Sequence, residues 1–139
     1  MPTSAPDFVF LTCTATVAAS DPIGAIDNVT ITDDPSVTGV IRFLIPQGQT
    51  WVFEDLYISA SANAGTSDPL ISVFKGGARL MGRTPPLSNL LVTNNSRPPY
   101  ANRKIGFRGG EELRMSTLAT VANDATADSI SFGVRVKVT

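Results

Sequence analysis

The sequence predicts an all-β protein, a single-domain jelly-roll or Greek-key β-sandwich of about eight strands. The clearest observation is that residues 129–138 alternate between apolar and polar side chains without a break. A period of two places all five apolar side chains on one face of a β-strand. Similar runs recur along the chain, separated by turn-forming residues. The composition agrees, because 42% of the residues are hydrophobic and only 17% are charged, with 10 prolines and 11 glycines.

The first two predicted strands are residues 8–17 and 26–32. Residues 8–17 are rich in aromatic, β-branched and threonine side chains, which favour a strand. Residues 26–32 alternate, with Val29 and Ile31 on one face and polar side chains on the other. Turn-forming aspartate, proline, glycine and serine flank this second run, so it is expected to form one short strand.

The next predicted strands are residues 40–45 and 51–60. The first ends at Pro46, which opens a turn. The second carries large apolar side chains on both faces, which indicates a central strand or one that a neighbouring subunit covers. Of its aromatic residues, Trp51 and Phe53 are interpreted as core residues.

The C-terminal half begins with a predicted hairpin. Residues 70–75 and 78–81 flank Gly76-Gly77, and a two-residue glycine link between strand patterns is a strong hairpin signal. A loop rich in proline and asparagine follows over residues 83–100. The remaining predicted strands are residues 104–107, 113–118 and 129–138, with 90–93 as a further short candidate.

The chain of 139 residues is long enough for one domain with one core. Residues 1–7 are interpreted as a flexible, extended N-terminal arm and residues 8–139 as the jelly-roll domain. The single cysteine, Cys13, lies in an apolar run and is expected to be a small buried hydrophobe. We find neither a signal-peptide pattern nor an apolar run long enough to cross a bilayer. The expectation is therefore synthesis and use in the cytosol, or export by a route that needs no leader, and no membrane partner.

The charges are separated along the chain although they nearly cancel, to a net charge of −1. Residues 1–41 contain five aspartates and no cation, and residues 75–108 contain seven cations and no acid. The seven cations are Lys75, Arg79, Arg83, Arg97, Arg103, Lys104 and Arg108. Opposite poles suit pairing between subunits or docking on a charged protein surface, and solvated loop charges are the alternative.

The sequence predicts neither an enzyme nor a metal or cofactor site. It contains no histidine, the commonest general base and metal ligand. Asp124 and Asp128 could contribute to a Ca²⁺ site, but solvated loop acids are the preferred interpretation because a full oxygen cage is not evident. Nucleic acid is not expected as a partner, since the net charge is slightly negative and no RNA-binding motif is present.

Two segments carry a resemblance to a known family. Residues 45–59 (IPQGQTWVFEDLYIS) form one half, and residues 109–115 (GGEELRM) with the acidic loop 124–128 and the terminal strand form the other. Together they resemble the small jelly-roll capsid cement (decoration) proteins of tailed bacteriophages. The resemblance covers roughly residues 40–139 and depends on strand and turn patterning. It implies a structural virion protein on the outer capsid surface, with the major capsid protein as partner. It also implies self-association, as a homo-oligomer or dimer.

The candidate interface residues are apolar anchors near the arm and cations of the basic segment. They are Phe8, Phe10, Arg79, Arg83, Arg97 and Arg103. The alternative function is a virion-associated module that binds a receptor or glycan, with Asn94, Asn95 and Tyr100 as local candidates.

Overall fold

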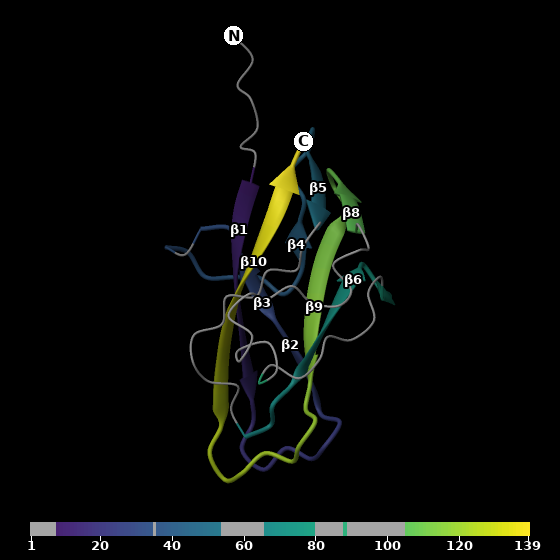
Figure 1. Ribbon diagram of the computed structural model, residues 1–139. Coiled ribbons are helices and arrows are strands. Elements are labelled where there is room, and N and C mark those ends of the chain that lie inside the picture. The colour runs from purple at the N-terminus through teal and green to yellow at the C-terminus, as the bar shows by residue number, and fades with distance from the viewer. Residues whose placement is uncertain (1–7, 35, 54–65, 80–87, 89–104) are drawn as a thin grey trace.

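The computed structural model describes residues 8–34, 36–53, 66–79, 88 and 105–139 (Figure 1). Ten strands lie within these residues, and every strand pair is antiparallel. The strands are β1 Phe8–Val17, β2 Ile26–Asn28, β3 Thr30–Thr32, β4 Phe43–Leu44, β5 Thr50–Phe53, β6 Leu70–Lys75, β7 Ala78–Arg79, β8 Ile105–Arg108, β9 Glu112–Leu118 and β10 Asp128–Val138. The predicted arm, residues 1–7, lies outside the described residues.

The strands form two sheets. Sheet A has the order β3-β1-β10-β5-β8, and sheet B has the order β2-β9-β6-β7, with β4 also pairing with β9. Successive strands alternate between the sheets except at the β6–β7 hairpin, and the first strand lies beside the last. This connectivity is that of a jelly roll. The predicted all-β sandwich is therefore confirmed, and the short strands β3 and β4 extend it beyond eight strands.

The pairing of β1 with β10 forms the centre of sheet A. Ten residue pairs join the two strands, from Phe8 opposite Lys137 to Val17 opposite Asp128. The odd-numbered residues of β1 from Leu11 onward and the even-numbered residues of β10 from Ile130 onward are buried. The apolar side chains that alternate along both strands therefore face the core. There they belong to one hydrophobic cluster with Ile71, Val73 and Met115 of sheet B.

Trp51 and Phe53 belong to the core, as predicted. Their rings pack against Phe43 and Phe107, with centroid distances of 5.4 and 5.5 Å respectively. The indole Nε1–H of Trp51 donates a hydrogen bond to Gln49, so the buried ring leaves no polar atom unpaired. The predicted strand 51–60 is described over Thr50–Phe53, and its residues 54–60 lie outside the described residues.

The interpretation of residues 26–32 as one strand is wrong. The run breaks at Val29, so that β2 pairs with β9 in sheet B while β3 pairs with β1 in sheet A. The Val29 side chain is fully buried, and its N–H donates to the carbonyl of Met115. One segment with an uninterrupted alternating pattern therefore contributes a strand to each sheet. This is possible because the buried side chains of both sheets face the same core.

The predicted strand at residues 40–45 is shorter than expected. Only Phe43–Leu44 forms a strand, and Val40 makes an isolated bridge with Ile31. The predicted Gly76-Gly77 hairpin is present, with Phe74 opposite Arg79. Its residues 80–81 and the candidate strand 90–93 lie outside the described residues. No helix in the described part of the chain is long and apolar enough to span a bilayer.

Asp124 and Asp128 are not simply solvated loop acids. Asp128 accepts hydrogen bonds from the backbone N–H and the hydroxyl of Ser67, and Asp124 accepts one from the hydroxyl of Thr66. These bonds join the start of β10 and the loop before it to the loop before β6. Within the described residues no group of three histidine, cysteine, aspartate or glutamate side chains lies close enough to hold a metal ion.

Candidate docking surface

The first candidate surface lies at the N-terminal end of β1. Phe8 and Phe10 face outward from sheet A because the alternating residues of β1 from Leu11 onward face the core. Their side chains remain 47% and 64% exposed. The three following outward positions on this strand are all threonine. Two exposed phenylalanines are not required by the fold, which makes them candidates for contact with a partner.

The register of β1 and β10 places cations beside the two rings. Phe8 lies opposite Lys137, and Phe10 lies opposite Arg135. The Arg135 guanidinium carbon lies 5.1 Å from the centroid of the Phe8 ring, which is a cation–π contact. We call these four residues the Phe8–Arg135 surface: Phe8, Phe10, Arg135 and Lys137.

The described strand positions on the outer face of sheet A carry a net positive charge. They include Arg108, Arg135 and Lys137, and none of these described outward positions is an aspartate or glutamate. The other outward positions of β10 and those of β1 beyond Phe10 are threonine, serine or glycine. The face can therefore bury two aromatic rings and pair with carboxylates of another protein at the same time.

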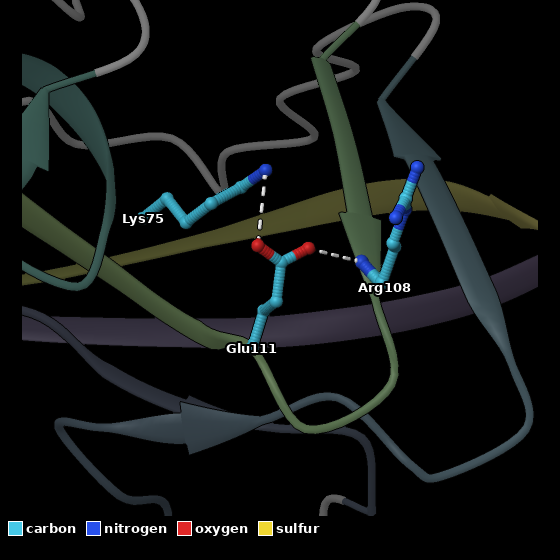
Figure 2. A network of polar contacts seen from close by, with 3 residues as sticks. All are labelled: Lys75, Arg108 and Glu111. Atoms are coloured by element: carbon cyan, nitrogen blue, oxygen red, sulfur yellow. Dashed lines mark hydrogen bonds and ion pairs between the residues drawn. The ribbon is translucent and has the colours of Figure 1, made fainter.

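A polar network fixes the neighbouring turn between β8 and β9 (Figure 2). One carboxylate oxygen of Glu111 accepts a 2.6 Å hydrogen bond from the backbone N–H of Arg108, and the other lies 3.3 Å from Lys75 Nζ. The Arg108 guanidinium points away from this carboxylate (Figure 2). The backbone hydrogen bond, and to a smaller extent the contact with Lys75, lowers the pKa of Glu111. We assign the network a structural role.

A second apolar surface lies in the connection between β3 and β4 and continues to Leu44 of β4. It consists of the exposed side chains of Val37, Val40, Ile41 and Leu44, which we call the 37–44 segment. The connection projects beside β1 at the edge of the sandwich (Figure 1). Four large apolar side chains exposed within eight residues exceed the scattered exposure that a monomer normally shows.

The structure places the sequence-predicted interface residues unevenly. Phe8 and Phe10 lie together on the outer face of the paired strand β1, directly after the predicted arm. Arg79 lies in β7, opposite Phe74. Arg83, Arg97 and Arg103 lie outside the described residues. Sequence reasoning missed Arg135 and Lys137, because the alternating pattern of β10 gives no sign of which strand lies beside it.

No protein-family model matches the chain, and no curated protein is significantly similar to it. The exposed surfaces, together with the resemblance of residues 45–59 and 109–115 to the cement proteins, therefore remain as the basis for a proposed function.

Proposed function

We propose that the protein is a structural protein of a phage virion, a capsid cement (decoration) protein. It binds the outer surface of an icosahedral shell and stabilises contacts between major capsid protein subunits. The observation that carries this proposal is the Phe8–Arg135 surface, where two exposed aromatic rings lie beside two cations on a face without described carboxylates. The resemblance in sequence to the cement proteins supports the choice of partner.

The Phe8–Arg135 surface can contribute only a moderate binding free energy per copy, which suits a protein that binds a shell in many copies. Each phenyl ring that a partner covers contributes roughly 1–2 kcal/mol, since both rings are about half exposed beforehand. Ion pairs of Arg135 and Lys137 at the rim contribute about 0.2–1 kcal/mol each and set the orientation. One copy therefore binds weakly. Self-association would link several such contacts and raise the effective concentration of each.

The basic segment is proposed as a second part of the interface. Arg79, Arg83, Arg97 and Arg103 would pair with carboxylates of the major capsid protein or of another copy of the chain. Arginine suits this role, because its guanidinium is weakly hydrated and binds a carboxylate through two parallel hydrogen bonds.

Binding of purified protein to particles that lack it tests the proposal. The variant Phe10→Glu replaces an exposed ring by a negative charge beside Arg135. We expect its occupancy on the shell to fall at least tenfold, because the variant loses apolar contact and repels the acidic partner. Its melting temperature should change little, since Phe10 is largely exposed. Occupancy is measured by quantitative mass spectrometry of washed particles.

The matched control is Ser129→Glu. Ser129 is also exposed on the outer face of β10, but it lies six residues from Arg135, or about 20 Å along the strand. Its occupancy should equal that of the wild type. Absence of the protein from assembled particles would reject the cement function. Full occupancy of the double variant Phe8→Glu/Phe10→Glu would reject the Phe8–Arg135 surface.

A further inference from the structure

The connection between β3 and β4 is held against sheet A at its base (Figure 1). Val40 exchanges two backbone hydrogen bonds with Ile31 of β3, one through its N–H and one through its carbonyl. A Cβ added at Gly39 would lie 3.1 Å from the Ile31 backbone nitrogen, so the chain at this position lies directly against β3. The described residues that carry the 37–44 segment are therefore fixed relative to the sheet.

Polar contacts of Asp34 fix the first part of the same connection. One carboxylate oxygen of Asp34 accepts hydrogen bonds from the hydroxyl and the backbone N–H of Ser36, and these bonds lower the pKa of Asp34. The Thr32 hydroxyl donates to the carbonyl of Asp34 and accepts from its N–H. A surface that is already ordered loses little conformational entropy when it binds a partner.

The fold does not use the apolar side chains of the 37–44 segment. Val37, Val40 and Ile41 are 55%, 48% and 41% exposed, and none of them belongs to the buried cluster between the sheets. An ordered connection that keeps large apolar side chains in water is a candidate for contact with another protein chain.

The outward edge of the connection has unpaired backbone donors. Val40 directs both of its backbone groups toward Ile31. Within the described part of the chain, the N–H groups of its neighbours Gly39 and Ile41 make no hydrogen bond. Unpaired backbone groups at the edge of a sheet are a template for pairing with the edge of another chain.

The charges of the connection have both signs. Asp33 and Asp34 precede the apolar residues, and Arg42 follows them. The Arg42 side chain is 73% exposed, and its Nε lies 3.9 Å from Glu112, which makes this a weak surface pair. Opposite charges on the two sides of an apolar centre make the surface complementary to a second copy of itself. The two aspartates would repel the acidic partner that suits the Phe8–Arg135 surface.

We infer that two copies of this chain associate through the 37–44 segment, in a two-fold contact between equivalent connections. Val37, Val40 and Ile41 of both copies form its apolar centre, and the two open edges meet antiparallel. Asp33 of each copy lies near Arg42 of the partner subunit. The inference rests on the proposed function only for its use, because a linked pair presents two Phe8–Arg135 surfaces to the shell.

The expected contact is small. Standard protein interfaces bury roughly 800 Å² per partner, and four apolar side chains that are about half exposed cover only part of such an area. Association should therefore be reversible and depend on protein concentration, with a Kd of about micromolar or weaker.

Sedimentation velocity of the full-length chain, over about a hundredfold range of concentration, tests the inference. We expect the mean mass to rise from that of a monomer toward that of a dimer. Ile41→Glu should raise the Kd at least tenfold, because it brings like charges together across the two-fold axis. The matched control is Ile23→Glu, at an isoleucine that is 68% exposed in the turn between β1 and β2. Its Kd should equal that of the wild type.

An exchange of charges tests the two-fold arrangement. Asp33→Arg and Arg42→Glu should each weaken association, since each places like charges opposite each other. Combined in one chain, the two changes restore opposite charges and should recover most of the lost affinity. If the two losses add in the double variant, Asp33 and Arg42 of different copies do not face each other and the arrangement is wrong. Melting temperatures of dilute samples show that every variant is folded.

The inference fails if the wild type stays monomeric at the highest concentration, or if Ile41→Glu leaves the dimer intact. Neither result bears on shell binding by single copies, which the occupancy of Phe10→Glu measures separately. A third outcome also overturns it. If the wild type is monomeric and Ile41→Glu lowers occupancy on the shell, the 37–44 segment contacts the shell and not a second copy.

Discussion

Burial decides the chemistry of Cys13. The side chain is inaccessible to solvent, and its Sγ lies 4.0 Å from the sulfur of Met115 in the opposite sheet. Burial raises the pKa of the thiol from its usual 9.0 to about 12, because the apolar surroundings disfavour the thiolate. The sequence-based interpretation of this residue as a small hydrophobe is confirmed.

Cys13 should therefore resist alkylation in the folded protein. The change in pKa lowers the thiolate fraction at neutral pH by roughly 1,000-fold, and burial slows access of the reagent further. We expect iodoacetamide to leave the native protein unmodified over hours and to label it rapidly in concentrated urea. Mass spectrometry gives the labelled fraction. Rapid labelling of the native protein would show that Cys13 is accessible and reactive.

The turn between β8 and β9 shows how one element is fixed by close approach and charge. At Gly109 an added Cβ would lie 2.7 Å from the Pro46 carbonyl oxygen, so a side chain there would displace backbone. Gly110 has a φ of +86°, a conformation that other residues rarely adopt. Glu111 completes the turn through its hydrogen bond from the Arg108 N–H.

Glu111→Gln should destabilise the protein at neutral pH but not in acid. The folded-state pKa of Glu111 lies below its unfolded value of about 4.5, so its contribution is present above the unfolded pKa. That contribution is lost as the pH falls through the folded pKa. We expect wild type to melt at a higher temperature than the variant at pH 7, and this difference to shrink by pH 2.5.

The control for this prediction repeats the comparison in a Lys75→Gln background. The backbone hydrogen bond from Arg108 is the larger cause of the lowered pKa of Glu111. Removing Lys75 should therefore preserve most of the pH-dependent loss of melting temperature that Glu111→Gln causes. A loss that is independent of pH, or one that grows in acid, would contradict the assigned role of the carboxylate.

At the scale of the whole molecule, the jelly-roll connectivity joins distant parts of the chain. The first and last described strands pair over ten residue pairs, and the backbone groups of Thr139 and Thr50 hydrogen-bond to each other. Both of these strands must meet before sheet A is complete. Folding therefore requires closing long loops before most contacts form.

Refolding should accordingly be slow for a domain of this size. All-β proteins dominated by non-local pairing fold in about milliseconds to seconds. Trp51 is fully buried in the core and provides the fluorescence signal for stopped-flow dilution from urea. We expect the main phase in that range. Complete recovery within microseconds would indicate that local structure, and not the pairing of β1 with β10, limits folding.

The candidate surface could be predicted only in part. The exposure of Phe8 and Phe10 follows from the alternation within β1, so those residues could be found by sequence reasoning. Their proximity to Arg135 and Lys137 could not, because it depends on which strand pairs with β1 and in which register.

The sequence by itself determined which side chains face the core. In β1 from Leu11 onward, β9 and β10, side chains alternate between buried and exposed or partly exposed positions, because a period of two is a local property of extended backbone. The tertiary structure alone decided the break at Val29, the order of the strands and the surfaces that result. Those features depend on contacts between residues far apart in the chain, and a pattern within one segment carries no information about its neighbour.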